Sequence, residues 1–176
     1  KFPCEGSTSF DGTNDYIDTG DAFQSTLRGD FTISFWMKAT DGQPSGSERI
    51  FGCRNDESAP EDQIYLELRT DGKLRLGYEA NDDSFEKTTA SAVFSDGQTA
   101  WSHIAISVQK NIAGGYNLYA DGILEESFAT TDVSTVNWEA YTSTRNLFIG
   151  SFNSTGTSSN FFDGSLANVA IWSRAL

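Results

Sequence analysis

Aromatic and planar polar side chains alternate along several predicted strands, a combination that suits the binding of a sugar. Glycan sites place an aromatic face against the C–H surface of the sugar and planar polar groups against its hydroxyls. The side chains of this kind on the polar faces of the predicted strands are Trp36, Tyr65, Glu67, Arg69, Arg75 and His103. If these strands are neighbours, they line one sheet, and the polar loop 153–160 adds Asn160 at its rim. We therefore predict a glycan site that contains Trp36, Tyr65, Glu67, Arg75 and Asn160.

The carboxylates of the chain give little support to glycoside hydrolysis. A retaining glycosidase needs two carboxylates about 5 Å apart, often from alternate residues of one strand. Glu125 and Glu126 are adjacent, so on a strand they point to opposite faces. Glu67 can instead form an ion pair with Arg69 or Arg75. Because no Ser/His/Asp or Cys/His set stands out either, we predict a protein that is not an enzyme.

The charge balance excludes two classes of partner. The chain has 12 basic and 25 acidic residues and a net charge of −13. Nucleic-acid binding needs a basic surface, and an anionic membrane also repels an acidic protein. No stretch reaches the roughly 20 apolar residues that span a bilayer. Cys4 and Cys53 form one disulfide or remain two buried thiols, and with a single histidine they cannot complete a common zinc cage.

Alternating hydrophobicity predicts the elements that position these residues. Residues 101–122 resemble two strands of a hairpin, because branched apolar side chains recur at every second position. Residues 30–39 show the same period, and 63–69 and 73–79 flank an Asp-Gly turn. A short helical turn is expected within 23–27. The pattern predicts an all-β fold, a two-sheet antiparallel jelly-roll sandwich, with residues 1–176 forming one domain.

Four stretches, in this order, resemble motifs of the laminin-G-like branch of the concanavalin A-like lectin/glucanase superfamily. They are 9–17 (SFDGTNDYI), 31–38 (FTISFWMK), 101–122 (WSHIAISVQKNIAGGYNLYADG) and 147–176, which opens with LFIG and closes with FDGSLANVAIWSRAL. The resemblance implies a concanavalin A-like jelly roll in which Trp101 and His103 are structural. Family members are mostly carbohydrate- or protein-binding modules of extracellular, cell-surface or viral proteins, and some relatives hydrolyse glycans.

The resemblance also implies a structural calcium ion (Ca²⁺) where the first and last strands meet. Asp11, Asp15 and Asp163 are the candidate ligands, since calcium prefers carboxylate and carbonyl oxygens. The family pattern has Asp-Glu where this sequence has Ala167-Asn168, which removes one expected ligand. A second acidic group contains Asp56, Glu57, Glu61 and Asp62. The alternative for both groups is turn chemistry and solvated acids.

Taken together, these features predict a non-catalytic binding module of a secreted, cell-surface or virion protein, with a glycan or glycoprotein as its partner. The first alternative is a structural or adhesive domain that packs against protein neighbours, for which an exposed apolar patch is expected. A glycoside hydrolase is the third interpretation.

Overall fold

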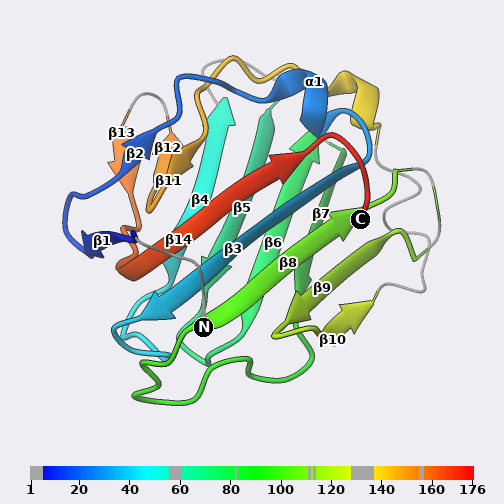
Figure 1. The fold of residues 1–176 in the computed structure, drawn as a ribbon. Coiled ribbons are helices and arrows are strands. Elements are labelled where there is room, and N and C mark those ends of the chain that lie inside the picture. Colours follow the sequence, from blue (N-terminus) through cyan, green and yellow to red (C-terminus); the bar gives the residue numbers. More distant parts are fainter. Residues whose placement is uncertain are drawn as a thin grey trace.

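A computed structural model describes residues 6–55, 61–81, 83–110, 112, 114–127, 137–154 and 157–176. Within these residues two sheets pack face to face (Figure 1). The first sheet has six strands, in the order β1 (Thr8–Asp11), β14 (Asp163–Trp172), β3 (Phe31–Ala39), β8 (Ser102–Val108), β9 (Tyr116–Ala120) and β10 (Ile123–Ser127). All of its pairings are antiparallel.

The second sheet has eight strands. Its main path runs through β13 (Thr157–Ser159), β12 (Phe152–Ser154), β4 (Glu48–Asn55), β5 (Asp62–Leu68), β6 (Leu74–Ala80) and β7 (Asp83–Thr88). The short strands β2 (Ile17–Asp18) and β11 (Phe148–Ile149) pair with each other, and β11 also pairs with β4. β12 runs parallel to β4, while the other pairs are antiparallel. The helix α1 (Gln24–Leu27) and the 3₁₀ turn η1 (Trp138–Ala140) lie near one end of the sandwich (Figure 1).

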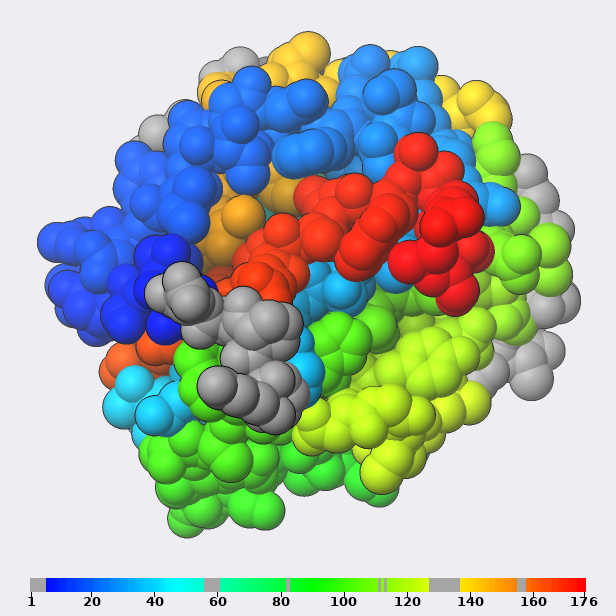
Figure 2. Space-filling view, in the orientation of Figure 1, coloured from blue at the N-terminus to red at the C-terminus, as the bar shows by residue number. Residues whose placement is uncertain are grey.

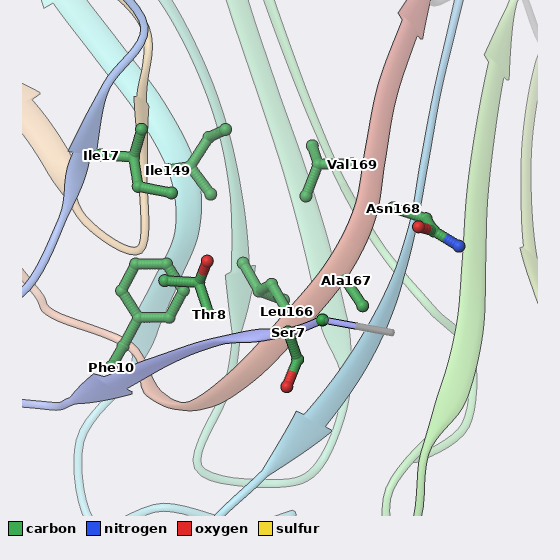
Figure 3. Close-up of a pocket in the computed structure, with 10 residues that line it drawn as sticks. Ser7, Thr8, Phe10, Ile17, Ile149, Leu166, Ala167, Asn168 and Val169 are labelled. Carbon is green, nitrogen blue, oxygen red and sulfur yellow. The ribbon is translucent and has the colours of Figure 1, made fainter. Parts of the chain in front are cut away.

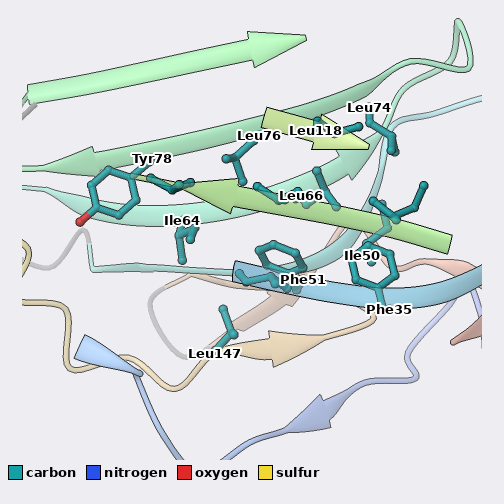
Figure 4. Close-up of a cluster of buried hydrophobic side chains, with 14 of the residues drawn as sticks. Phe35, Ile50, Phe51, Ile64, Leu66, Leu74, Leu76, Tyr78, Leu118 and Leu147 are labelled. Atoms are coloured by element: carbon teal, nitrogen blue, oxygen red, sulfur yellow. The ribbon is translucent and has the colours of Figure 1, made fainter. Parts of the chain in front are cut away.

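The predicted alternation of side chains builds the core. In β3, Phe31, Ile33, Phe35 and Met37 are all buried between the sheets. Leu66, Leu76 and Tyr78 face them from β5 and β6 (Figure 4). The two layers meet directly, because the rings of Phe35 in β3 and Phe51 in β4 have centroids 6.4 Å apart. Burial of these apolar faces is the main force that holds the sheets together.

Most sequence-based expectations of the fold are confirmed. The hairpins β5–β6 and β8–β9 form, the helical turn lies at Gln24–Leu27, and the fold is the all-β two-sheet sandwich. No helix among the described residues is long and apolar enough to cross a membrane. Cys53 is a buried free thiol, 3.4 Å from the Tyr141 hydroxyl, and burial raises its pKa to about 11. Cys4, its expected disulfide partner, lies outside the described residues.

Candidate functional site

The outer face of the eight-stranded sheet carries a cluster of arginines around one carboxylate. Strand pairing aligns Arg49 of β4, Glu67 of β5 and Arg75 of β6 in one row across the sheet. Arg69, just beyond the end of β5, approaches the same carboxylate. We call Arg49, Glu67, Arg69 and Arg75 the arginine cluster. It brings together two of the residues predicted for the glycan site, Glu67 and Arg75.

Glu67 is the counter-ion of this cluster. Its oxygens lie 2.9 Å from Nη1 of Arg49 and 2.6 Å from Nη2 of Arg75, and Arg69 is more distant at 3.9 Å. Only 1% of Glu67 is exposed. The expected ion pair with Arg75 is therefore confirmed. The prediction that Glu67 offers an exposed acceptor to sugar hydroxyls is wrong, because the residue is buried. A buried carboxylate needs such partners, because an unpaired buried charge is costly.

The ring of Tyr65 packs against the guanidinium of Arg49. The guanidinium of Arg49 lies 3.7 Å from the centroid of the Tyr65 ring, a cation–π contact. The ring in turn covers Gly77 of β6, where no side chain stands in its way. Because Tyr65 is only 2% exposed, the prediction that its ring offers a face to a sugar is wrong. Its role in this cluster is to position Arg49.

The Tyr65 hydroxyl reaches the edge of the sheet. It donates a hydrogen bond to Oε1 of Glu86 in β7, and Oε2 of the same carboxylate lies 3.4 Å from Nη1 of Arg75. Burial raises the pKa of Tyr65 to about 12, and its hydrogen bond to Glu86 acts in the same direction. The phenol is therefore protonated at neutral pH and acts as a donor.

The arginine cluster offers more donors than its own carboxylates use. Each guanidinium carries five N–H donors in a planar fork. The side chains of Arg49, Arg75 and Arg69 are 15%, 25% and 32% exposed. Within the described part of the chain, Nε of Arg49 and Nε of Arg75 have no hydrogen-bond partner. Arginine forks match the geometry of carboxylates, so the cluster can bind a planar anion.

Asn160 lies beside the strand that carries Arg49. It precedes β14, has a left-handed φ of 53°, and its carbonyl accepts the backbone N–H of Arg49 at 2.7 Å. Its side-chain amide donates to the Ser47 carbonyl at 3.5 Å. Asn160 is exposed, and its role at the rim of a glycan site stays a prediction.

Trp36 belongs to the opposite face of the molecule. It points outward from β3 in the six-stranded sheet, where its ring lies 5.1 Å from that of His103. Figure 2 shows this side, and a groove of about 330 Å³ on it has Ser34, His103 and Tyr119 in its lining. The prediction that Trp36 shares one sheet with Tyr65 and Arg75 is wrong. Alternation assigns a residue to a face of its strand, but it does not say to which sheet the strand belongs.

The carboxylates of the three aspartates predicted for calcium accept hydrogen bonds from the protein itself. Asp11 and Asp163 are paired between β1 and β14, as expected where the first and last strands meet. However, Oδ1 of Asp11 accepts the backbone N–H of Thr13 at 2.8 Å, and Oδ2 of Asp15 accepts that of Asp11 at 3.1 Å. No group of three or more potential metal-ligating side chains occurs among the described residues. The carboxylates of Asp11 and Asp15 stabilise a turn, the alternative considered from the sequence, and that of Asp163 accepts from the Thr40 hydroxyl at 2.7 Å.

The second acidic group is only partly described. Asp56 and Glu57 lie outside the described residues. Glu61 pairs with Arg54, and Asp62 is buried, where its carboxylate accepts the backbone N–H and the hydroxyl of Thr142, both at 2.8 Å. The two described members are thus occupied by protein donors.

A cavity of about 310 Å³ opens between β1, β2, β11 and β14 (Figure 3). Phe10, Ile17, Ile149 and Leu166 contribute apolar walls, and no acidic or basic side chain is among its lining residues. The register of β14 shifts beside it, between Ala167 and Ala170. The cavity therefore lacks the charged groups that the arginine cluster offers.

Arg49, Glu86 and the glycines of the site were not predicted from the sequence. The signal for the glycines was present, because Gly52 and Gly77 interrupt two strand patterns, and glycine in a strand often marks a close approach. Here Gly52 makes room for the Phe152 ring and Gly77 for the Tyr65 ring. The Phe152 and Tyr65 rings meet edge to face at 6.1 Å, and the Arg49 guanidinium lies 5.1 Å from the centroid of Phe152.

The sheet order defines a two-sheet jelly-roll domain. Residues 11–176 match the Concanavalin A-like lectin/glucanases superfamily, so the chain belongs to this family. No curated protein sequence matches the chain significantly.

Solved structures with the same fold include carbohydrate-binding modules of sialidases. The CBM40 module of the Ruminococcus gnavus IT-sialidase superposes with a TM-score of 0.74 at 16% identity, over 97% of this chain and 93% of that chain. The leech intramolecular trans-sialidase matches with a TM-score of 0.75 at 16% identity, over 98% of this chain and 26% of the enzyme. A heptameric SAP-like pentraxin from Limulus polyphemus matches with a TM-score of 0.60 at 18% identity, over 97% of this chain and 76% of the pentraxin chain. At these identities the likeness concerns the fold.

Proposed function

We propose that this chain is a non-catalytic carbohydrate-binding module that binds an acidic sugar at the arginine cluster. The observation that carries the proposal is the convergence of Arg49, Arg69 and Arg75 on the outer face of the eight-stranded sheet, where their side chains remain 15%, 32% and 25% exposed. Neutral sugars do not require three guanidinium groups, whereas a sugar carboxylate matches their fork.

The architecture of the cluster suits recognition of a carboxylate. Glu67 holds the guanidinium groups of Arg49 and Arg75 together and reduces their mutual repulsion. Tyr65 fixes the plane of Arg49, so less side-chain entropy is lost when a ligand binds. In this arrangement a ligand carboxylate accepts from Arg49 and Arg75, and Asn160 at the rim contacts a hydroxyl.

A likeness to solved sialyllactose complexes also supports an acidic sugar. The Ruminococcus gnavus module has been solved with α2,3 and with α2,6 sialyllactose bound, and both complexes superpose on this chain with TM-scores of at least 0.70. Sialylated glycans are displayed on cell surfaces, so the proposal places the chain in a secreted, cell-surface or virion protein. The net charge of −13 makes long-range steering of an acidic glycan unfavourable, so contacts at the cluster must supply the affinity.

Titration calorimetry with 3′-sialyllactose and lactose tests the proposal. We expect binding of 3′-sialyllactose and none of lactose. Arg75→Lys keeps the charge but loses the fork, and it should weaken binding by roughly tenfold. Arg174→Lys is the matched control, because the exposed Arg174 follows β14 of the other sheet. Equal binding by Arg75→Lys, or the absence of any binding by the wild type, would contradict the proposal.

A protein-binding role is the second candidate function. The edge strand β10 exposes Ile123 and Leu124, which are 65% and 48% accessible. An exposed apolar edge can accept a strand from a partner. Sedimentation of the wild type and of the Ile123→Lys variant tests this role for self-association. If β10 is a protein-binding edge, the wild type assembles and the variant does not.

A further inference from the structure

Glu86 lies on the strand at the edge of the site, and its carboxylate contacts two of the donors of the site. It is in β7, directly across from Gly77 of β6, so no side chain separates it from the Tyr65 ring. Its Oε1 accepts from the Tyr65 hydroxyl, and its Oε2 lies 3.4 Å from Nη1 of Arg75. Its side chain is nevertheless 53% exposed.

Glu67 and Glu86 differ sharply in their relation to the arginine cluster. Glu67 is almost wholly buried and is held by the closest ion pairs of the cluster, so it is part of the scaffold. Glu86 makes a longer contact to Arg75 from an exposed position, and ion pairs of this kind contribute little to stability. Its carboxylate is therefore free to leave Arg75 without disturbing the core.

We propose that Glu86 is an internal competitor that occupies, at Arg75 and Tyr65, the donors which a ligand carboxylate would use. This inference rests on the proposed function. A ligand carboxylate has the same chemistry as Glu86 and must displace it or share Arg75 with it. Glu86 thus lowers the affinity of the site for every anion.

The competitor also acts on selectivity. A neutral hydroxyl is a weaker acceptor than a carboxylate, so it does not displace Glu86 from Arg75. An anion that offers a second contact, to Arg49 or to the rim at Asn160, can do so. Glu86 therefore makes the site reject both neutral sugars and small anions, and it reserves the site for acidic sugars with additional polar groups.

Acetate is a suitable probe, because it offers a carboxylate and nothing else. The experiment titrates acetate against chloride at constant ionic strength and follows the side-chain Nε–Hε NMR signals of Arg49 and Arg75. Three proteins are compared: wild type, Glu86→Gln and Glu79→Gln. Glu79 is the matched control, since it lies on β6 of the same sheet, pairs with Gln63 and carries the same charge. Glu86→Gln keeps an acceptor for the Tyr65 hydroxyl, so the fold is preserved.

We expect Glu86→Gln to bind acetate roughly tenfold more tightly than the wild type, as removal of one nearby like charge predicts. Glu79→Gln should change the affinity less than twofold. An acetate affinity of Glu86→Gln that equals that of Glu79→Gln, or no response of the arginine signals, overturns the inference.

Titration of the same proteins with 3′-sialyllactose separates this inference from the proposed function. If Glu86→Gln gains acetate binding and no protein binds 3′-sialyllactose, the proposed function fails and the competitor role stands. If the wild type binds 3′-sialyllactose and Glu86→Gln gains no affinity for acetate, the competitor role alone fails.

Discussion

The substitution Gly77→Ala tests whether the Tyr65 ring holds the arginine cluster in place. A Cβ added at Gly77 would lie less than 3.0 Å from three atoms of this ring, a distance that real Cβ atoms do not adopt. The ring must therefore leave its position. Its movement breaks the cation–π contact with Arg49 and the hydrogen bond to Glu86. One added methyl group therefore disturbs the residues on both sides of Tyr65.

The expected cost follows from three contributions. Overpacking of a close contact costs about 1 to 3 kcal/mol, a lost hydrogen bond about 1 kcal/mol, and a lost cation–π contact about 0.5 to 1 kcal/mol. Replacing glycine within a strand returns about 0.5 to 1 kcal/mol through the unfolded chain. The net loss is about 3 kcal/mol, which corresponds to a fall in Tm of about 6 to 12 °C for a protein of this size.

Urea unfolding and calorimetric titration with 3′-sialyllactose measure the two effects. Gly46→Ala is the control, because Gly46 lies in the loop before β4 and no atom lies within 4 Å of the added Cβ. We expect Gly77→Ala to lose about 3 kcal/mol of unfolding free energy and most of its affinity, and Gly46→Ala to lose neither. If the unfolding free energies of the two variants differ by less than about 0.5 kcal/mol, the Tyr65 ring does not pack over Gly77 as described.

Two further predictions concern carboxylates outside the site. Burial, together with the charges of neighbouring acids including Asp163, raises the pKa of Glu48 from 4.5 to about 7. The contribution of Glu48 to stability is therefore complete below pH 4.5 and is lost as the pH rises through about 7. Glu48→Gln should match the wild type at pH 4 and exceed it at pH 8 by about 1 to 2 kcal/mol, after allowance for solvent screening. A difference between variant and wild type that is the same at both pH values would refute this. Asp62→Ala should lower the free energy of unfolding in urea by at least about 3 kcal/mol, because the N–H of Asn81 and both donors of Thr142 lose a buried acceptor. A loss below about 1 kcal/mol would show that water replaces the carboxylate.

The fold could be predicted from the sequence because local and global signals agree along most strands. In β3 every second residue is apolar and buried, and the Asp71-Gly72 turn sets the β5–β6 hairpin. The site was only partly predictable. The pattern placed Glu67 and Arg75 together, but it could not separate them from Trp36, since strand alternation carries no information about sheet membership.

Arg49 was missed for a different reason. Strict alternation places Arg49 on the same face as Phe51 and Cys53, which are both buried. The register between β4 and β5 shifts between Arg49 and Phe51, so Arg49 pairs with Glu67 and Phe51 with Leu66. The extra residue turns Arg49 to the outer face. A bulge of this kind re-aims one side chain, and the sequence of β4 alone gives no sign of it.

The position of the last residues has a practical consequence for how the protein can be handled. The backbone of Leu176 accepts from the Ser107 hydroxyl and donates to the Thr32 hydroxyl, so the chain is tied to the outer face of the six-stranded sheet at that point. The arginine cluster lies on the outer face of the other sheet. A linker, dye or sensor surface attached after Leu176 therefore starts on the side opposite the cluster. Immobilised in this orientation, the protein would present its arginines to the solution, as a glycan-capture reagent requires.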